Sequence, residues 1–281
     1  MTIAATGDLV ADAARRGTAV AALNVITLEH AEAIASAAES VGIPVIMQVS
    51  ENAVRFHGGR LRPIAAAAAQ VAENAGVPIA VHLDHVTDDE LAEQAAAAGF
   101  SSLMYDAGAL PYDENVQRTR HAAHTAHAAG LWIEAELGYV GGKPDSPRSA
   151  HDKGVRTDPD EAARYVESTS VDALAVAVGS SHAMTTQTAR LDAELISRLR
   201  ERVPVPLVLH GSSGVPDDEL RAGIAAGIAK VNIGTALNIA MTGAVRGVLD
   251  ADPKLVDPRK YLAPARDAMT DAVAHVLEVM R

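Results

Sequence analysis

Short apolar runs alternate with alanine-rich stretches along most of the chain. Each apolar run ends in polar side chains, and between the runs apolar residues recur three and four positions apart. Runs of this kind are typical of buried strands, and the spacing between them is typical of amphipathic helices. The predicted strands are residues 19–23, 44–49, 78–83, 101–105, 131–137, 173–178, 206–210 and 229–233.

Eight strands, each followed by a helical stretch, predict an α/β protein with a (β/α)8 TIM barrel. We expect one domain over residues 1–281, with an extra N-terminal helix at 7–16 and a C-terminal helical extension at 236–249 and 264–280. A doubly wound sheet is the main alternative. It would normally have a glycine-rich turn after the first strand, and the segment LNVITLEH at that place has no glycine.

The composition argues against several classes of partner and binding site. The net charge is −12 and basic residues do not cluster, which argues against a nucleic-acid partner or an anionic membrane surface. Cysteine is absent, so disulfides and thiolate metal sites are excluded. The N-terminus does not resemble a signal peptide, and no apolar run is long enough to span a membrane. We expect a cytoplasmic protein.

Polar side chains stand at the carboxyl end of every predicted strand. In a TIM barrel these ends share one rim, where active sites form. Three of the residues are histidines, and three imidazoles with an open position suit a catalytic divalent metal, zinc first. A single rim histidine is more often only hydrogen-bonded, but three at equivalent positions favour a metal site. The strand-end residues are Asn24, Ser50, Asp84, His85, Asp106, Glu136, His182, His210 and Asn232.

Different roles are expected for the other acidic residues and histidines of the sequence. Asp84 should point into the barrel by strand alternation, as a general acid/base or as a residue that orients a ligand, and we favour the first. His82 shares that direction and is expected to support its neighbours. Asp106 and Glu136 are plain rim carboxylates or hold a cation. His121, His124 and His127 are spaced like ligands, but they lie on an outer helix and are interpreted as a solvated face.

Two glycine-containing segments predict a phosphate site. HGSSG at 210–214 follows the seventh strand and NIGT at 232–235 follows the eighth. Either could be an ordinary turn, but TIM barrels often bind phosphate at these two strands. A phosphate beside a metal and a proton carrier suggests proton or carbon–carbon chemistry next to a carbonyl. Metal-dependent hydrolysis is the competing class, although such barrels usually carry His-x-His on the first strand, which here ends in Asn24.

The motifs VHLDH, LMYDAG with PYDEN, EAELG, VGSSH, LVLHGSSG and KVNIGT together resemble the class II, zinc-dependent ketose-bisphosphate aldolases. The resemblance extends from the first strand to DPRKYLAPARDAM at 257–269. It implies a lyase of carbohydrate metabolism and glycolysis. The implied reaction is reversible cleavage of fructose- or tagatose-1,6-bisphosphate to dihydroxyacetone phosphate and glyceraldehyde 3-phosphate. A homodimer or homotetramer is implied as well.

The resemblance also implies residue roles. Asp84 is the catalytic acid/base, and His85, His182 and His210 bind Zn²⁺. Asp106 and Glu136 match positions that hold a second metal or displaced zinc. A monovalent cation, Na⁺ or K⁺, assists at the dihydroxyacetone-phosphate site. Arg259 reaches the second phosphate, in some members from a neighbouring subunit. The implied substrate contacts are Asn24, Ser50, Ala183, Gly211, Ser212, Ser213, Asn232, Ile233, Gly234, Thr235 and Arg259.

Three departures from the family pattern bear on substrate and rate. Pro144, in the long loop at 138–157, stands where members carry a glutamate that moves a substrate proton, and Asp145 or Glu136 is the candidate substitute. Ala183 replaces the usual glycine, and the segment from Asp106 departs from Asp-Gly-Ser. An aldolase for another phosphorylated sugar, such as a deoxy-keto acid or a sulfo-sugar, is therefore an alternative. A non-catalytic sugar-phosphate binder is another.

Overall fold

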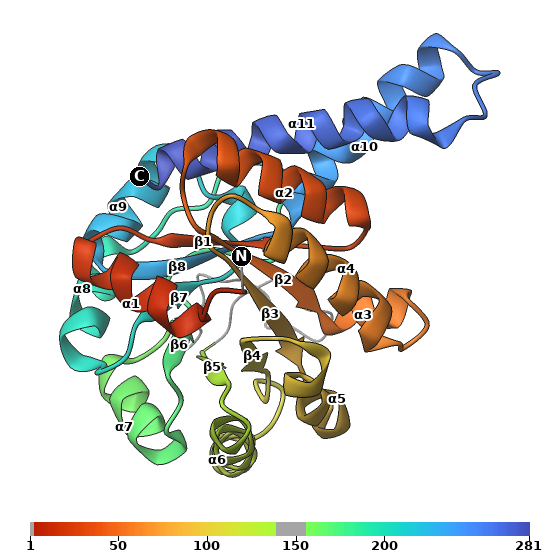
Figure 1. The fold of residues 1–281 in the computed structure, drawn as a ribbon. Helices are drawn as coiled ribbons and strands as arrows, with labels where there is room; N and C mark the ends of the chain where they lie inside the picture. Colours follow the sequence, from red (N-terminus) through yellow and green to blue (C-terminus); the bar gives the residue numbers. More distant parts are fainter. Residues whose placement is uncertain (1–2, 139–155) are drawn as a thin grey trace.

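A computed structural model describes residues 3–138 and 156–281. Pro144 and Asp145, with most of the predicted loop at 138–157, lie outside the described residues. Eight parallel strands close into one barrel in sequence order, which confirms the TIM barrel (Figure 1). The strands are β1 (Val20–Asn24), β2 (Val45–Ser50), β3 (Ile79–Val86), β4 (Ser102–Tyr105), β5 (Trp132–Leu137), β6 (Ala173–Val176), β7 (Leu207–Leu209) and β8 (Ile228–Ile233).

Helices surround the barrel, and α1 and α10 begin within one residue of the predicted starts. One helix was not predicted: α3 follows directly on β2, because Ser50 Oγ accepts the N–H of Ala53 and caps it. The last helix starts at Pro258, and Pro264 lies inside it instead of opening it. The helices are α1 (Thr6–Arg16), α2 (Leu28–Val41), α3 (Glu51–Phe56), α4 (Leu61–Asn74), α5 (Asp89–Gln94), α6 (Tyr112–Ala128), α7 (Pro159–Thr169), α8 (Ala193–Arg202), α9 (Asp217–Ala226), α10 (Thr235–Ala251) and α11 (Pro258–Val279).

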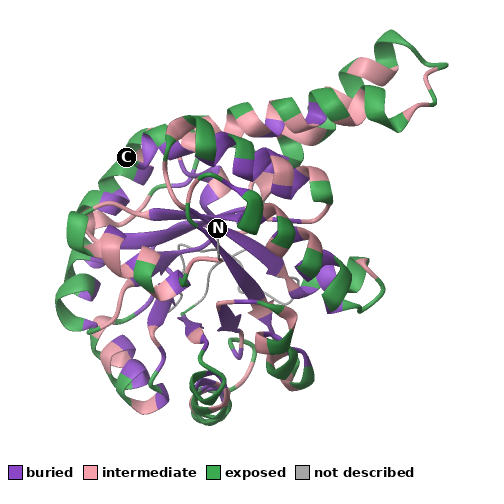
Figure 2. Cartoon of the chain, viewed as in Figure 1, coloured by how far each residue is buried: buried purple, intermediate pink, exposed green. Residues whose placement is uncertain are grey.

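The main core lies between the barrel and its helices. Leu23, Leu83 and Ile133 point outward from their strands and are fully buried beneath the helices. Figure 2 shows the strands as a continuous buried centre, with exposed residues on the outer faces of the helices and in the loops. Alanine at many contact positions lets the helices approach the sheet closely, so the low aromatic content does not prevent a well-filled core.

The interior of the barrel is closed at its amino end by α1. Val10 and Ala13 of this helix pack on Val20, Ala22 and Ile46 inside the barrel. The helix runs across the open end of the strands in Figure 1. The extra N-terminal helix therefore fills the lower end of the barrel with apolar side chains, and the carboxyl end remains for chemistry.

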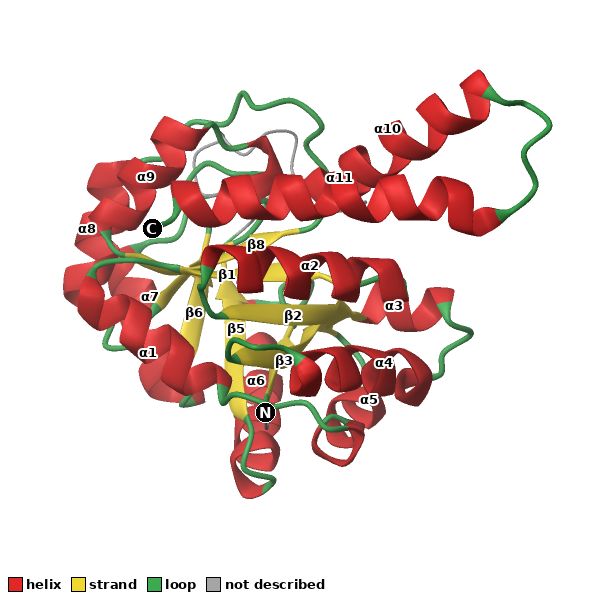
Figure 3. Cartoon of the chain, turned by 45° about the horizontal axis from the view of Figure 1, so that its top comes forward, coloured by secondary structure: helices red, strands yellow, loops and turns green. Residues whose placement is uncertain are grey.

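The C-terminal extension forms a long two-helix arm. α10 and α11 run antiparallel side by side and project beyond the barrel (Figure 3). Leu237 is the one buried side chain of α10 in this structure, whereas Ile239 is 48% exposed. Among the described residues, no helix has the length and apolar character needed to cross a bilayer.

Candidate active site

A cavity of about 520 Å³ opens at the carboxyl end of the barrel, a size suited to a small ligand. Most strand-end residues that the sequence singled out line it, although they come from distant parts of the chain. The predicted residues in its wall are Asn24, Ser50, Asp84, His85, Asp106, His182, Ala183, Gly211, Ser212, Ser213, Asn232, Gly234 and Thr235.

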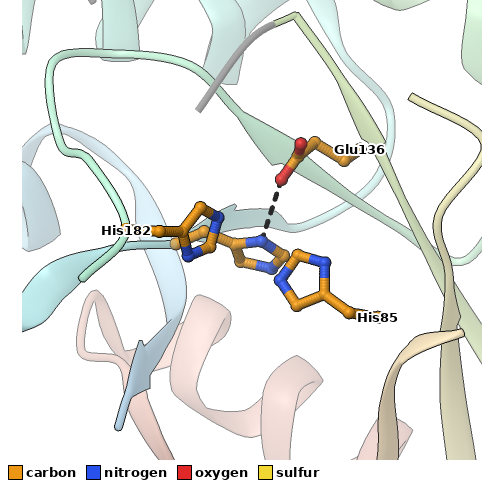
Figure 4. Close-up of side chains that lie close together, drawn as sticks. His85, Glu136 and His182 are labelled. Carbon is orange, nitrogen blue, oxygen red and sulfur yellow. Dashed lines mark hydrogen bonds and ion pairs between the residues drawn. The ribbon is translucent and has the colours of Figure 1, made fainter. Parts of the chain in front are cut away.

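Four side chains at the same end of the barrel form a possible metal site, and two of them, His85 and His182, line the cavity. His85, Glu136, His182 and His210 each offer a ligand atom, and these atoms lie within 4.8 Å of one another. In Figure 4 the labelled side chains His85, Glu136 and His182 converge from different strands and loops. Three imidazoles and one carboxylate form a donor set that suits Zn²⁺ and similar divalent ions. The residues present therefore fit a divalent metal.

An irregular strand end lets two neighbours in the sequence face one site. Strand alternation would send Asp84 and His85 to opposite faces of β3. His85 instead has φ +50°, and the β3–β4 register shifts between Leu83 and Val86. Asp84 points inward as predicted and is 2% exposed, and the kink brings the next imidazole to the same cavity.

Asp106 holds His85 and lies outside the four-residue cluster. The Nδ1–H of His85 donates to Asp106 Oδ2 at 2.8 Å, so its Nε2 is available to a metal. Whether Asp106 also holds a second metal stays a prediction.

His210 lies between two carboxylates. Its Nε2 is 2.7 Å from Glu134 Oε1 and its Nδ1 is 3.0 Å from Glu136 Oε2, and all three side chains are buried. Burial alone would lower the pKa of His210, but hydrogen bonds and attraction to the two carboxylates raise it to about 9. In the absence of a metal the ring is thus an imidazolium, and a metal would take the place of one proton.

Asp84 lies in a strongly positive environment. Burial alone would raise its pKa, but attraction to the positive charges of His85, His210 and Lys230 outweighs burial, so the pKa is lowered. Asn232 Nδ2 donates to Asp84 Oδ1 at 3.4 Å. Asp84 is therefore a carboxylate that can accept a proton from a ligand in the cavity.

His82 has the inward direction that alternation predicts. It is fully buried, its Nδ1 is 2.7 Å from Ser102 Oγ, and burial lowers its pKa to about 3. It is a neutral side chain next to the site.

The predicted phosphate segments line the cavity with backbone groups. Gly211 has φ +66°, and a Cβ there would lie 2.5 Å from the carbonyl carbon of Ser181, so no larger residue fits. Gly234 immediately precedes α10, whose N-terminal N–H groups favour an anion. Ser213 Oγ accepts from the N–H of Ala236 at 3.1 Å, which joins the two segments.

Two predicted substrate contacts do not line the cavity. The side chain of Ile233 is 2% exposed and packs in the outer core, so only its main chain could contribute. Arg259 is on the arm, where its 89%-exposed side chain pairs with Asp257. The fold keeps Arg259 out of the cavity within one chain, and a role for it from a neighbouring subunit stays a prediction.

Several residues at the site were not predicted. Gln48, Glu51, Arg55, Thr87 and Asn238 line the cavity. Glu51 is buried and accepts from the Thr87 N–H at 2.6 Å and from Arg55.

Strand alternation contained a usable signal for some of the missed residues. Gln48 lies two positions before Ser50, and Glu134 lies two positions before Glu136, so each shares the inward direction of the residue that was predicted. Arg55 had no such signal, because it depends on the unexpected helix α3.

Comparison with known proteins agrees with this geometry. Residues 4–281 match the family model of fructose-bisphosphate aldolase class-II, so the chain belongs to this family and is a lyase. Fructose-bisphosphate aldolases of Staphylococcus aureus (strain Mu50) and Geobacillus stearothermophilus are each 38% identical over 97% of this chain and 95% of theirs. The crystal structure of the YdjI aldolase from Escherichia coli K12 is 31% identical, with a TM-score of 0.84 over 99% of this chain and 97% of that chain. Membership in the family implies a divalent metal, which the histidine cluster fits.

Proposed function

We propose that the chain is a Zn²⁺-dependent aldolase that reversibly cleaves a ketose 1,6-bisphosphate, fructose- or tagatose-bisphosphate, to dihydroxyacetone phosphate and glyceraldehyde 3-phosphate. The observation that carries this proposal is the cluster of His85, His182 and His210 near Asp84, next to the cavity that the glycine-rich phosphate segments line. The names of the similar aldolases support the same substrate class.

The proposed metal ligands are His85, His182 and His210, with Glu136 close enough to complete the set. Asp106 orients His85 through Nδ1. When bound there, a divalent ion supplies a Lewis acid that polarises the substrate carbonyl and stabilises the negative charge left on it as the carbon–carbon bond breaks.

Asp84 is the proposed proton carrier. As a carboxylate it accepts the proton of the C4 hydroxyl while the C3–C4 bond breaks and the C4 oxygen becomes an aldehyde. The electron pair of the broken bond moves toward C2. The hydrogen bond from Asn232 and the positive groups around Asp84 keep its carboxylate ionised and in place before the reaction.

The phosphate next to the carbonyl is proposed to bind at 211–213 and 232–235. The N–H groups and hydroxyls of these two segments are the donors for the phosphate oxygens, and no carboxylate is needed to hold it. A monovalent cation, Na⁺ or K⁺, is proposed to assist there. Ser50 and Asn24 are proposed to contact the sugar, and Ala183 to contact it through its main chain. These residues all line the same cavity.

We propose one domain over residues 1–281 and a homodimer or homotetramer. The projecting arm of α10 and α11 would place Arg259 in the cavity of a neighbouring subunit, where its guanidinium binds the second phosphate. Its exposure and its absence from the lining of its own cavity support a role between subunits.

An aldolase for another phosphorylated sugar is the second candidate. Ala183 favours it, because this alanine has φ +58° directly after His182, at a place in the cavity wall where a glycine would be unstrained. Its methyl group alters the space available to the substrate.

The test is a coupled cleavage assay on fructose- and tagatose-1,6-bisphosphate, with metal content measured on the same purified protein. We expect stoichiometric zinc, activity that chelation removes and zinc restores, and turnover of at least one of the two sugars. Zinc-dependent turnover of neither sugar, with activity on another ketose phosphate, would select the second candidate. A protein with no zinc and no activity after zinc addition would be a sugar-phosphate binder.

A further inference from the structure

A buried ion pair crosses the centre of the barrel beneath the cavity. Lys230 and Glu134 are fully buried, and Lys230 Nζ donates to Glu134 Oε2 at 2.8 Å. Lys230 also donates to Asn232 Oδ1 at 2.8 Å. A buried ammonium with two such acceptors is fixed in direction, since any rotation would leave a charge without a partner.

Each acceptor of Lys230 continues to a residue of the proposed reaction. Glu134 uses its other oxygen, Oε1, to contact Nε2 of His210 at 2.7 Å. Asn232 uses its amide nitrogen to donate to Asp84 at 3.4 Å. The Lys230 ammonium therefore determines which oxygen of Glu134 faces the imidazole of His210. It also determines that the NH₂ end of the Asn232 amide faces Asp84.

The direction of Glu134 determines the tautomer of His210. Because Oε1 can only accept, Nε2 carries a hydrogen. Nδ1 also carries one while it donates to Glu136 Oε2, and this is the hydrogen that a metal at the cluster would replace, leaving the lone pair on Nδ1. Nδ1 is the nitrogen that faces Glu136, a member of the metal cluster. Nδ1 is therefore the nitrogen through which His210 would bind a metal at the cluster.

We infer that Lys230 and Glu134 are positioning residues that hold His210 in the Nδ1-ligating tautomer and, through Asn232, hold Asp84 in place. This inference rests on the proposed metal-dependent function. Two other roles for the pair are less consistent with the geometry. A Schiff-base lysine would need access to the cavity, and Lys230 has no exposed surface. A purely stabilising pair is disfavoured because burial of two charges costs about as much as their attraction returns.

Glu134→Gln gives a sharp test, because the side chain keeps its size and loses one acceptor. Lys230 still requires an oxygen, so the amide oxygen turns to Lys230 and the amide NH₂ faces His210 Nε2. That nitrogen must then accept, which moves the ring proton to Nδ1 and blocks ligation. We expect zinc affinity, measured by chelator competition, to fall about 10- to 100-fold, with a changed absorption spectrum of the Co²⁺-substituted protein.

The double variant Lys230→Met with Glu134→Gln distinguishes the effect of the direction of the side chain at position 134 from the effect of losing its charge. Without the ammonium, the amide can turn its oxygen to His210 and restore the ligating tautomer. We expect the double variant to regain part of the zinc affinity that the single variant loses. At saturating zinc its kcat should stay low with KM unchanged, because Asn232 has lost its anchor while the phosphate segments are intact. Equal affinity in the single and double variants would overturn the proposed orientation.

Tyr165→Phe is the control for general loosening. Its hydroxyl is buried, donates to Asn115 Oδ1 at 2.7 Å and does not line the cavity. We expect lower thermal stability with unchanged zinc affinity. If this variant also loses zinc affinity, or if Glu134→Gln binds zinc as the wild type does, the inference is wrong. If the wild-type protein binds no divalent metal, the proposed function fails first, so the two failures are distinguishable.

Discussion

The two ends of the barrel interior are built from the same strands and have opposite characters. At the amino end, Val20, Ala22 and Ile46 meet the apolar face of α1. At the carboxyl end, Lys230 and Glu134 form an ion pair of fully buried charges. β5 illustrates the change, because Trp132 packs on the apolar layer and Glu134, the next inward-facing residue, belongs to the ionic layer.

The difference separates stability from chemistry. The amino end can gain free energy from burial of apolar surface, and its side chains need no partners. The carboxyl end must satisfy every charge internally, so its side chains have few alternative arrangements. That restriction is useful in a site where ligands and a proton carrier have to be in position before the substrate arrives.

The largest expected effect is at the carboxyl end. His210→Ala should remove a metal ligand and lower kcat/KM by at least about 10³-fold, since Lewis-acid stabilisation is worth several kcal/mol.

Asp84→Ala should retain zinc and lower kcat about 10²- to 10⁴-fold, the usual contribution of an acid/base group. Zinc content and steady-state kinetics on both variants provide the check. Full activity in Asp84→Ala would remove its assigned role.

At the amino end the expected effect is on stability. Ile46 is fully buried, so Ile46→Ala should cost about 2–5 kcal/mol in the free energy of unfolding. Denaturant unfolding measures this cost. Zinc affinity and kcat of the folded variant should stay close to wild type, and Val256→Ala, at a side chain that is 88% exposed, is the control. A loss of zinc affinity in Ile46→Ala would show that the two ends are coupled.

A smaller effect is expected at the edge of the cavity. Arg55 is the guanidinium that lines it among the described residues, and it pairs with the buried Glu51. Arg55→Met should raise KM for a bisphosphate about tenfold, the loss of one charge-assisted hydrogen bond, with kcat little changed. Arg62→Met, an exposed residue of α4, is the matched control. An unchanged KM would exclude Arg55 as a substrate contact.

The smallest effect is a pH dependence of stability at the carboxyl end. His30 is buried at the start of α2, with its Nε2 3.2 Å from Asn238 Oδ1. Burial lowers its pKa, only partly offset by that hydrogen bond and by Glu29. A lowered pKa contributes stability above the unfolded value near 6.5, and this contribution is lost as pH falls below it. His30→Gln should therefore reduce the decline of Tm as pH falls below about 6.5, and an unchanged profile would contradict this.

The sequence predicted the barrel, its strand order and most of the cavity wall. Asp84, His182 and His210 were identifiable because parallel strands in a barrel expose their carboxyl ends on one rim, so position along the chain was sufficient. Arg259 was identifiable only as a possible contact. Its location depends on where the arm of α10 and α11 points, which no local pattern encodes.

The sequence by itself determined the fold and the residue types of the site, because apolar periodicity and strand-end chemistry are local properties. Only the tertiary structure decided how they connect. It placed His85 beside Asp84 through a left-handed backbone conformation, and it brought Lys230 of β8 and Glu134 of β5 together across strands that do not pair. Contacts between residues so far apart in the chain follow from the closure of the sheet, which fixes distances that no single segment contains.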